Sequence, residues 1–329
     1  MRLDDSRAHL RSHRWARLRF DRIRAQLHPG AGLAVVMVVL SSLLYSLGYA
    51  ITKSLIETWH FDAMQLFVLR SLLVLAGLAA LPLLGRRPPS IERLLHPPQA
   101  MMQRAAATAL VVSAVLAMIG YGYLPVTTAT AFSFTTPLLV TAMAAIFLRE
   151  QVPPLRWCAV ALGFAGVLVI VHPGGPDFGG GHLIGVAAAF GSAALYALQQ
   201  MLLRRARETT TTMDVIAQAA LVGLVLLGSF MPFVWKTVPL SALTLILLAT
   251  VTQTGGLLTI AAAIRMGEVS KLAPWQYGGM VWAILLDLFM FGHAPAKAAL
   301  VGAAMIVAGG LISQLRLPAL RIRARPRTP

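Results

Sequence analysis

Residues 41–47 read SSLLYSL, and residues 192–198 read SAALYAL. Each copy lies inside an apolar run of about 20 residues, the length that a helix needs to cross the hydrocarbon core of a bilayer. A second pair of similar segments has one member in each half: GVL at 166–168 aligns with GGL at 309–311. The chain therefore reads as two related halves built from apolar runs, and these runs decide the fold.

The composition excludes most other classes of protein. Of the 329 residues, 57% are hydrophobic and 12% are charged, whereas soluble domains have about 45–50% apolar and about 25% charged residues. Disorder needs the opposite balance, and the single cysteine, Cys158, excludes a disulfide scaffold. The net charge of +16 does not indicate a nucleic-acid partner, because nearly all of it lies between or outside the apolar runs. We expect an all-α, polytopic membrane protein.

Ten apolar runs are long enough to predict transmembrane helices. They lie at 32–52, 63–84, 105–123, 126–148, 155–172, 183–203, 213–234, 239–262, 269–291 and 296–314. The predicted organisation is therefore a basic arm at 1–31, a five-helix repeat at 32–172, a second five-helix repeat at 183–314 and a basic tail at 315–329.

Arginine and lysine residues predict the orientation, because cytoplasmic loops carry the excess of basic residues. With the amino terminus inside, the cytoplasmic segments hold 24 of the 28 basic residues, and the outer segments hold Lys53, Lys236 and Lys297. Both termini are therefore expected in the cytoplasm, which agrees with an even number of spans. The basic arm could bind anionic headgroups or act only as a topology signal, and the sequence leaves the two open.

Five spans in each half have a topological consequence. Because five is odd, the second half enters the membrane upside down relative to the first. Inverted halves of this kind are typical of secondary transporters, in which they enclose a site near the bilayer midplane and rock about it. Chance similarity between apolar helices is the alternative explanation of the matching segments.

Further short segments are distributed over residues 32–314. They are Lys53, QLFVLR at 65–70, TPL at 136–138, FLRE at 147–150, RW at 156–157, Gly163, GV at 166–167, APWQY at 273–277 and FGHAP at 291–295. Together these segments resemble the EamA-type, ten-helix branch of the drug/metabolite transporter superfamily. His293 departs from the pattern, because the second repeat usually carries an acidic residue there, as the first does at Glu150.

The resemblance implies a secondary transporter or exporter that moves a small metabolite across a bacterial inner membrane by alternating access. Members of the superfamily transport amino acids, vitamins or S-adenosylmethionine-like compounds. The resemblance therefore does not identify the substrate, the direction of transport or the coupling ion.

Two charged residues are expected inside the membrane, where a charge at a helix centre costs about 2.5–3.5 kcal/mol on insertion scales. Arg70 lies in the second span and Asp287 in the ninth. Arg70 could bind a carboxylate or phosphate of the substrate, pair with Asp287, or extend toward the headgroups. Asp287 could also carry a coupling proton. Lys53 is expected to meet headgroups or Glu57, and the sequence leaves these alternatives open.

Aromatic and amide side chains predict the rest of a binding cavity, because such groups stack on and hydrogen-bond a small amphiphilic ligand. Besides Arg70 and Asp287, the predicted substrate-binding residues are Tyr45, Tyr49, Tyr196, Gln199, Gln253, Trp275 and Gln276. Tyr and Trp also anchor helices at the membrane interface, which is the alternative role. Glycines of the fifth and tenth spans are expected to pack at a helix interface or against a second copy.

Motifs for nucleotide-driven transport or for catalysis are missing from the sequence. None of its four lysines stands in a phosphate-loop pattern, and neither a G-x-S-x-G elbow nor a zinc-protease motif occurs. We expect no catalytic residues, no metal and no cofactor, with a small molecule and the lipid bilayer as partners. Proton coupling and a homodimer are left open. A membrane-embedded enzyme that modifies a lipid or prenyl substrate is the alternative function.

Overall fold

The computed structural model describes residues 29–85, 90–97, 99–147, 152–171, 179–205, 211–266, 272 and 275–314. In these ranges the regular structure is helical, without strands, which confirms the all-α prediction. Most of the basic arm, the basic tail and Glu150 lie outside the described residues.

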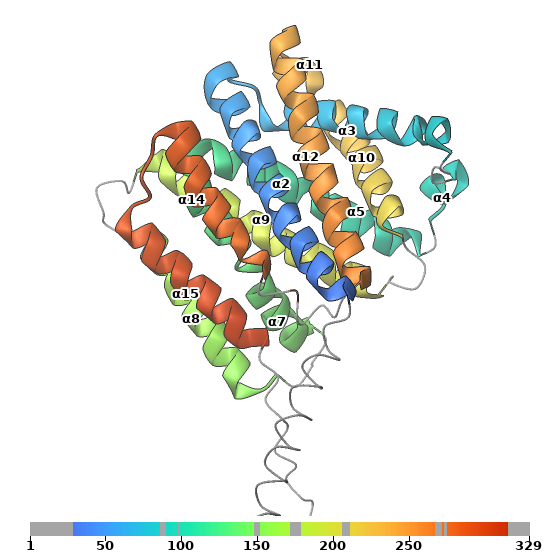
Figure 1. Ribbon diagram of the computed structural model, residues 1–329. Helices are drawn as coiled ribbons and strands as arrows, with labels where there is room; N and C mark the ends of the chain where they lie inside the picture. The colour runs from blue at the N-terminus through green and yellow to red at the C-terminus, as the bar shows by residue number, and fades with distance from the viewer. Residues whose placement is uncertain are drawn as a thin grey trace, which may run out of the picture.

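The helices form one bundle in which chain segments far apart in sequence lie side by side (Figure 1). In chain order they are α2 (Pro29–Trp59), α3 (Ala63–Ala79), η1 (Leu81–Leu84), α4 (Ile91–Leu95), α5 (Ala100–Tyr123), α6 (Val126–Ser133), α7 (Thr136–Phe147), α8 (Pro154–Val171), α9 (Gly180–Arg205), α10 (Thr212–Gly228), α11 (Met231–Val234), α12 (Leu240–Met266), α14 (Gly278–Phe291) and α15 (Lys297–Gln314).

Length and composition divide these helices into two groups. Seven described segments are long and apolar enough to cross a membrane, and three further apolar helices, α10, α14 and α15, are shorter. The three shorter helices occupy the predicted seventh, ninth and tenth spans. The polytopic membrane fold is confirmed, whereas the count of ten crossing helices stays a prediction.

The predicted fourth span is not one continuous helix. It consists of α6 and α7, separated at Phe134 and Thr135. Pro137 explains the interruption, because a proline has no N–H for the helical bond to the preceding turn and disfavours helical geometry at the residue before it. One carbonyl group at the break gains a hydrogen-bond partner from a side chain, since the Thr135 hydroxyl donates to the Phe132 carbonyl at 2.7 Å. The predicted span at 126–148 is thus found as one apolar segment, Val126–Phe147, that is long enough to cross a membrane, with its helix interrupted at Phe134 and Thr135.

The fifth and tenth spans, α8 and α15, pack closely along their length (Figure 1). A Cβ atom on Gly166 would meet the carbonyl oxygen of Gly302 at 2.6 Å, and one on Gly309 would meet that of Ala159 at 2.6 Å. Only glycine allows the two backbones to approach this far. The expected helix-interface role of these glycines is thus observed within the chain itself.

The most extensive helix contacts join α5 to α9, α2 to α12, α8 to α15 and α3 to α10. In the predicted repeat, α2 corresponds to α9, α3 to α10, α5 to α12 and α8 to α15. If each helix is replaced by its counterpart in the other half, the α2–α12 pair becomes the α9–α5 pair. The α3–α10 and α8–α15 pairs each become themselves. Two halves related by a two-fold axis would make these contacts, and the division into 32–172 and 183–314 stays a prediction.

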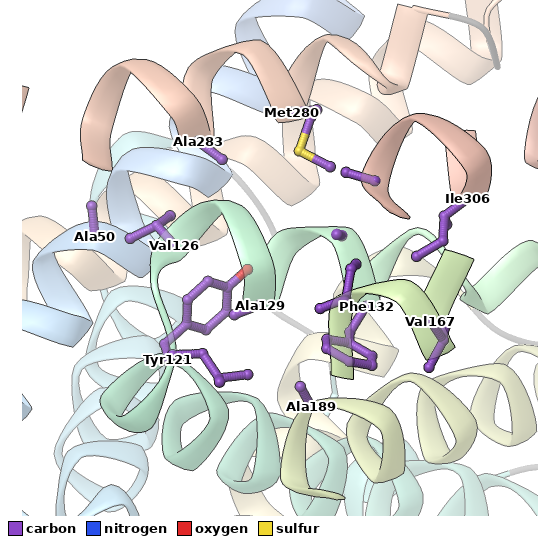
Figure 2. Close-up of a cluster of buried hydrophobic side chains, with 14 residues drawn as sticks. Ala50, Tyr121, Val126, Ala129, Phe132, Val167, Ala189, Met280, Ala283 and Ile306 are labelled. Carbon is purple, nitrogen blue, oxygen red and sulfur yellow. The ribbon is translucent and has the colours of Figure 1, made fainter. Parts of the chain in front are cut away.

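A hydrophobic cluster at the centre of the bundle surrounds α6 (Figure 2). Phe132 of α6 and Ile306 of α15 are fully buried there. Figure 2 also shows Met280 and Ala283 of α14 above α6, and Tyr121 of α5 beside it. The first half of the broken span is therefore packed inside the protein rather than against lipid.

Candidate binding site

Arg70 reaches the interior of the bundle from α3. Asp62 precedes that helix and caps it, because its carboxylate accepts the Met64 N–H at 2.8 Å. The Arg70 guanidinium donates to the Gln253 Oε1 at 2.5 Å. Its Nε is buried and has no hydrogen-bond partner among the described residues. Arg70 therefore keeps unused donor capacity inside the bundle.

Gln253 is held in place by close contact between α12 and α2. Its Nε2 donates to the Thr52 Oγ1 at 3.3 Å, so its Oε1 is left to accept from Arg70. A side chain on Gly48 would collide with Gln253. One turn along α12, the carbonyl of Gly256 accepts from the Ser41 hydroxyl at 2.7 Å. These contacts fix the amide that faces the guanidinium.

Tyrosine rings of α2 lie beside α12, the helix that carries Gln253, because a Cβ atom on Gly256 would meet the Tyr45 ring at 3.1 Å. Tyr45 and Tyr49 of α2 lie with ring centroids 6.4 Å apart, and Tyr49 stacks on Tyr121 of α5 at 4.5 Å. Arg70 meets the same face of α12 through its hydrogen bond to Gln253, one turn before Gly256. Tyr196 of α9 is 38% exposed, and its role in substrate binding stays a prediction.

We call these five side chains the tyrosine–arginine cluster. Its members are Tyr45, Tyr49, Arg70, Tyr121 and Gln253. Four were predicted from the sequence, and Tyr121 was missed. Tyr121 is one of the last residues of the predicted third span, and nothing local to it in the sequence indicates the stack on Tyr49.

The other predicted site residues lie elsewhere. Gln199, one turn along α9 from Tyr196, is 5% exposed and lines a cavity of about 10 Å³ together with Gln103 and Gln218. Trp275 and Gln276 are exposed just before α14. Their roles in substrate binding stay predictions.

Asp287 takes a partner that the sequence did not suggest. It is completely buried, and its two carboxylate oxygens accept the backbone N–H groups of Val126 at 2.8 Å and Thr127 at 2.6 Å. The ion pair between Asp287 and Arg70, which was one of the alternatives for Arg70, does not form between these two described residues. Lys53 instead forms an ion pair with Glu57 at 2.6 Å, as one alternative expected.

A larger cavity lies between α4, α5 and α10. It has a volume of about 290 Å³ and is lined by leucine and valine side chains together with Arg104 and Gln218. Gln218 donates to the Leu94 carbonyl at 2.7 Å. This cavity and the small one beside Gln199 both lie away from the tyrosine–arginine cluster.

Comparison with known proteins identifies the family. Residues 32–172 match the EamA-like transporter family. The riboflavin transporter of Rhizobium johnstonii is 31% identical over 245 residues, which cover 72% of this chain and 76% of that protein. This chain belongs to the EamA-like transporter family. The prediction of the drug/metabolite transporter superfamily is thereby confirmed.

Other relatives of this EamA-like chain match over a smaller part of their length. The S-adenosylmethionine uptake transporter of Rickettsia bellii is 29% identical over 188 residues, or 57% of this chain and 63% of that protein. A solved crystal structure superimposes with a TM-score of 0.57 at 20% identity, covering 87% of this chain and 96% of the other. That likeness shows a shared fold.

The cluster of this EamA-like chain combines two kinds of binding chemistry. A guanidinium binds carboxylate or phosphate oxygens through its fixed fork of N–H donors. Tyrosine rings contribute large apolar faces that stack on planar groups, together with hydroxyl groups that hydrogen-bond. Such a site suits a small molecule that has an anionic group next to a planar or apolar part.

Proposed function

We propose that this chain is a secondary transporter that moves a small metabolite across the bacterial inner membrane by alternating access. The tyrosine–arginine cluster is its substrate site in this proposal, and both termini are cytoplasmic. The distribution of basic residues supports the orientation. Relatives named as S-adenosylmethionine and riboflavin transporters support transport of a small molecule over modification of a lipid or prenyl substrate.

One observation carries the assignment of the site. Arg70 lies in a membrane-spanning helix, and among the described residues an amide is its hydrogen-bond partner while its Nε has none. A charge inside a membrane protein is costly and generally marks a functional site. A cation held without an acidic partner can accept an anionic group of a substrate, and the neighbouring rings of Tyr45 and Tyr49 can hold the remainder.

Thermal unfolding of the purified full chain with matched probes tests the site. Riboflavin and riboflavin 5′-phosphate share a planar ring and differ by a phosphate, and S-adenosylmethionine joins a planar base to a carboxylate. We expect an anionic probe to raise the unfolding temperature, because a ligand that binds the folded state stabilises it by mass action. The same probe should accumulate in proteoliposomes, and an imposed proton gradient should show whether protons drive it.

The variant Arg70→Met should abolish that stabilisation and lower uptake by tenfold or more. Arg104→Met is the matched control, since Arg104 is an exposed arginine bonded to the Leu95 carbonyl at 2.8 Å. Uptake that survives in folded Arg70→Met, or that is lost equally in Arg104→Met, would contradict the proposed site. Chemical modification of the probe without its movement would contradict transport.

A further inference from the structure

The chain reverses direction between α5 and α6 at Leu124 and Pro125. At a helix end, carbonyl groups or N–H groups have no partner within the helix. The free carbonyl groups of α5 and the free N–H groups of α6 therefore meet at one place in the bundle. Leu124 and Val126 are both 0% exposed there, so these groups need partners from the protein.

Lys53 of α2 binds the end of α5. Its Nζ donates to the carbonyl oxygens of Tyr121 at 3.2 Å and Leu124 at 3.0 Å, and to the Glu57 carboxylate at 2.6 Å. The ammonium also lies 5.3 Å from the centre of the Phe291 ring. The residue is 3% exposed. A cation at a helix carboxyl end is favourable, because it meets the negative end of the helix dipole.

Asp287 of α14 binds the start of α6 in the complementary way. Its carboxylate accepts the first two N–H groups of α6, at 2.8 and 2.6 Å. An anion is favourable at this end, where free N–H groups and the positive end of the helix dipole coincide. One turn after Asp287, Phe291 of the same helix meets Lys53. We call Lys53, Asp287 and the reversal at 121–127 the charge clamp.

The charge clamp is directly connected to the tyrosine–arginine cluster through Tyr121. The carbonyl of Tyr121 accepts from Lys53, its ring stacks on Tyr49 at 4.5 Å, and its hydroxyl lies 3.2 Å from the Thr130 hydroxyl. A displacement of the reversal would therefore move a ring that closes the cluster. In the same place the Thr127 hydroxyl is buried without a hydrogen-bond partner, so water reaching the reversal would find an unsatisfied group.

We propose that Lys53 and Asp287 are positioning residues of the transport cycle, and that release of the charge clamp opens the tyrosine–arginine cluster at this end of the bundle. The proposal rests on the proposed transport function. Asp287 belongs to the second predicted half and the reversal to the first, so the two halves separate here when the clamp is released. Water can replace each of these polar bonds, whereas the glycine-lined packing of α8 against α15 has no such substitute.

Reactivity of a single cysteine tests this inference without a substrate, so its result is independent of the proposed function. In the full chain with Cys158→Ser, the change Thr130→Cys places a thiol beside Tyr121, at a position that is 7% exposed. Labelling by a charged methanethiosulfonate reagent is followed in detergent, where both ends of the bundle are accessible. We expect slow labelling of this parent and labelling at least tenfold faster when Asp287→Asn or Lys53→Met is added.

Two controls separate opening of the clamp from general loosening. A thiol from Ser113→Cys, at a position on α5 that is 4% exposed, should label equally slowly with or without Asp287→Asn. Asp214→Asn changes a carboxylate in the capping box of α10. It should leave the labelling rate of Thr130→Cys unchanged. Gel filtration and the unfolding temperature identify folded variants.

The outcomes decide the proposal. A folded Asp287→Asn or Lys53→Met variant whose thiol at position 130 reacts no faster than in the parent would overturn it. The proposal would also be overturned if Asp287→Asn accelerated labelling of Ser113→Cys as much as labelling of Thr130→Cys. Failure of both clamp variants to fold would assign the two residues to folding alone and would overturn it as well.

Discussion

The two ends of α5 are closed in different ways. At its carboxyl end the charge clamp uses a cation and an anion that bind helix ends directly, with distances of 2.6–3.2 Å. At its amino end, buried amides and apolar side chains from α4, α9 and α10 meet around cavities of about 290 and 10 Å³. With 24 residues, α5 separates these ends by about 36 Å, at 1.5 Å per residue.

This difference indicates how each end can change. The charge clamp consists of hydrogen bonds between charged side chains and backbone groups at helix ends. Such bonds are directional, so the charge clamp is either formed or broken. Amides tolerate several arrangements, and a cavity leaves room for side chains to move. The tyrosine–arginine cluster adjoins the clamp end through Tyr121. Substitutions at the two ends and in the cluster should therefore differ in effect, and they are ordered below from the largest to the smallest.

Asp287→Ala should be the most destabilising of these substitutions. It removes two hydrogen bonds to a charged group, each worth about 1.5–3 kcal/mol, and leaves two buried N–H groups without partners. The free energy of unfolding, measured by titration with SDS in mixed micelles, should fall by about 3 kcal/mol or more. Asp214→Ala removes a capping carboxylate near the other end and should lose about 1 kcal/mol. Equal losses would remove the distinction between the ends.

Gln253→Glu should inactivate the cluster while keeping it folded. A carboxylate at this position would lie within 2.5 Å of the Arg70 guanidinium and form a charge-assisted bond in place of an anionic ligand. Affinity for the anionic probe should fall at least tenfold in isothermal titration, while the unfolding temperature stays the same or rises. Gln218→Glu is the control, because it changes an amide at the amino end of α5, and it should leave the affinity unchanged. Equal weakening of the affinity by both variants would argue against the cluster as the site.

Tyr49→Leu should have a moderate effect on stability. The stack on Tyr121 at 4.5 Å is expected to contribute about 0.5–1.5 kcal/mol beyond the burial of apolar area. Tyr45→Leu provides the comparison, because the centroid of its ring is 6.4 Å from that of Tyr49, and it should cost less. Unfolding titrations of both variants give the difference, and a larger loss in Tyr45→Leu would contradict the proposed link through Tyr121.

Gln199→Leu should produce the smallest change. Its amide lines a cavity of about 10 Å³ at the end that lacks the clamp, so leucine can be accommodated with a loss of about 1 kcal/mol or less. The reactivity of Thr130→Cys should not change in this variant. Faster labelling would mean that the two ends are mechanically coupled in the resting protein.

The sequence predicted the features that depend on local composition. Apolar runs of sufficient length located the helices, small residues indicated the close packing of α8 and α15, and Arg70 was conspicuous inside an apolar run. The break between α6 and α7 lies just before Pro137, which the sequence analysis used only as part of a family segment. Resemblance in short segments was sufficient for the family.

The partner of Asp287 could not be predicted in the same way. A search for the partner of a buried acid considers basic side chains, and Arg70 was the obvious candidate. The actual partners are backbone N–H groups, which every residue except proline has and which no sequence pattern distinguishes. They become available only because α6 begins inside the bundle, next to α14.

The amino-acid sequence by itself determined that this chain is helical, membrane-embedded and a member of the EamA-like transporter family, because hydropathy, span length and family segments are properties of consecutive residues. The tertiary structure decided which charges meet which groups. It placed Arg70 against an amide, and it placed Lys53 and Asp287 on the two helix ends of one reversal. That choice depends on where helices distant in sequence bring their free ends, because a charge buried in the bundle is stabilised by the nearest complementary dipole, whatever residue supplies it.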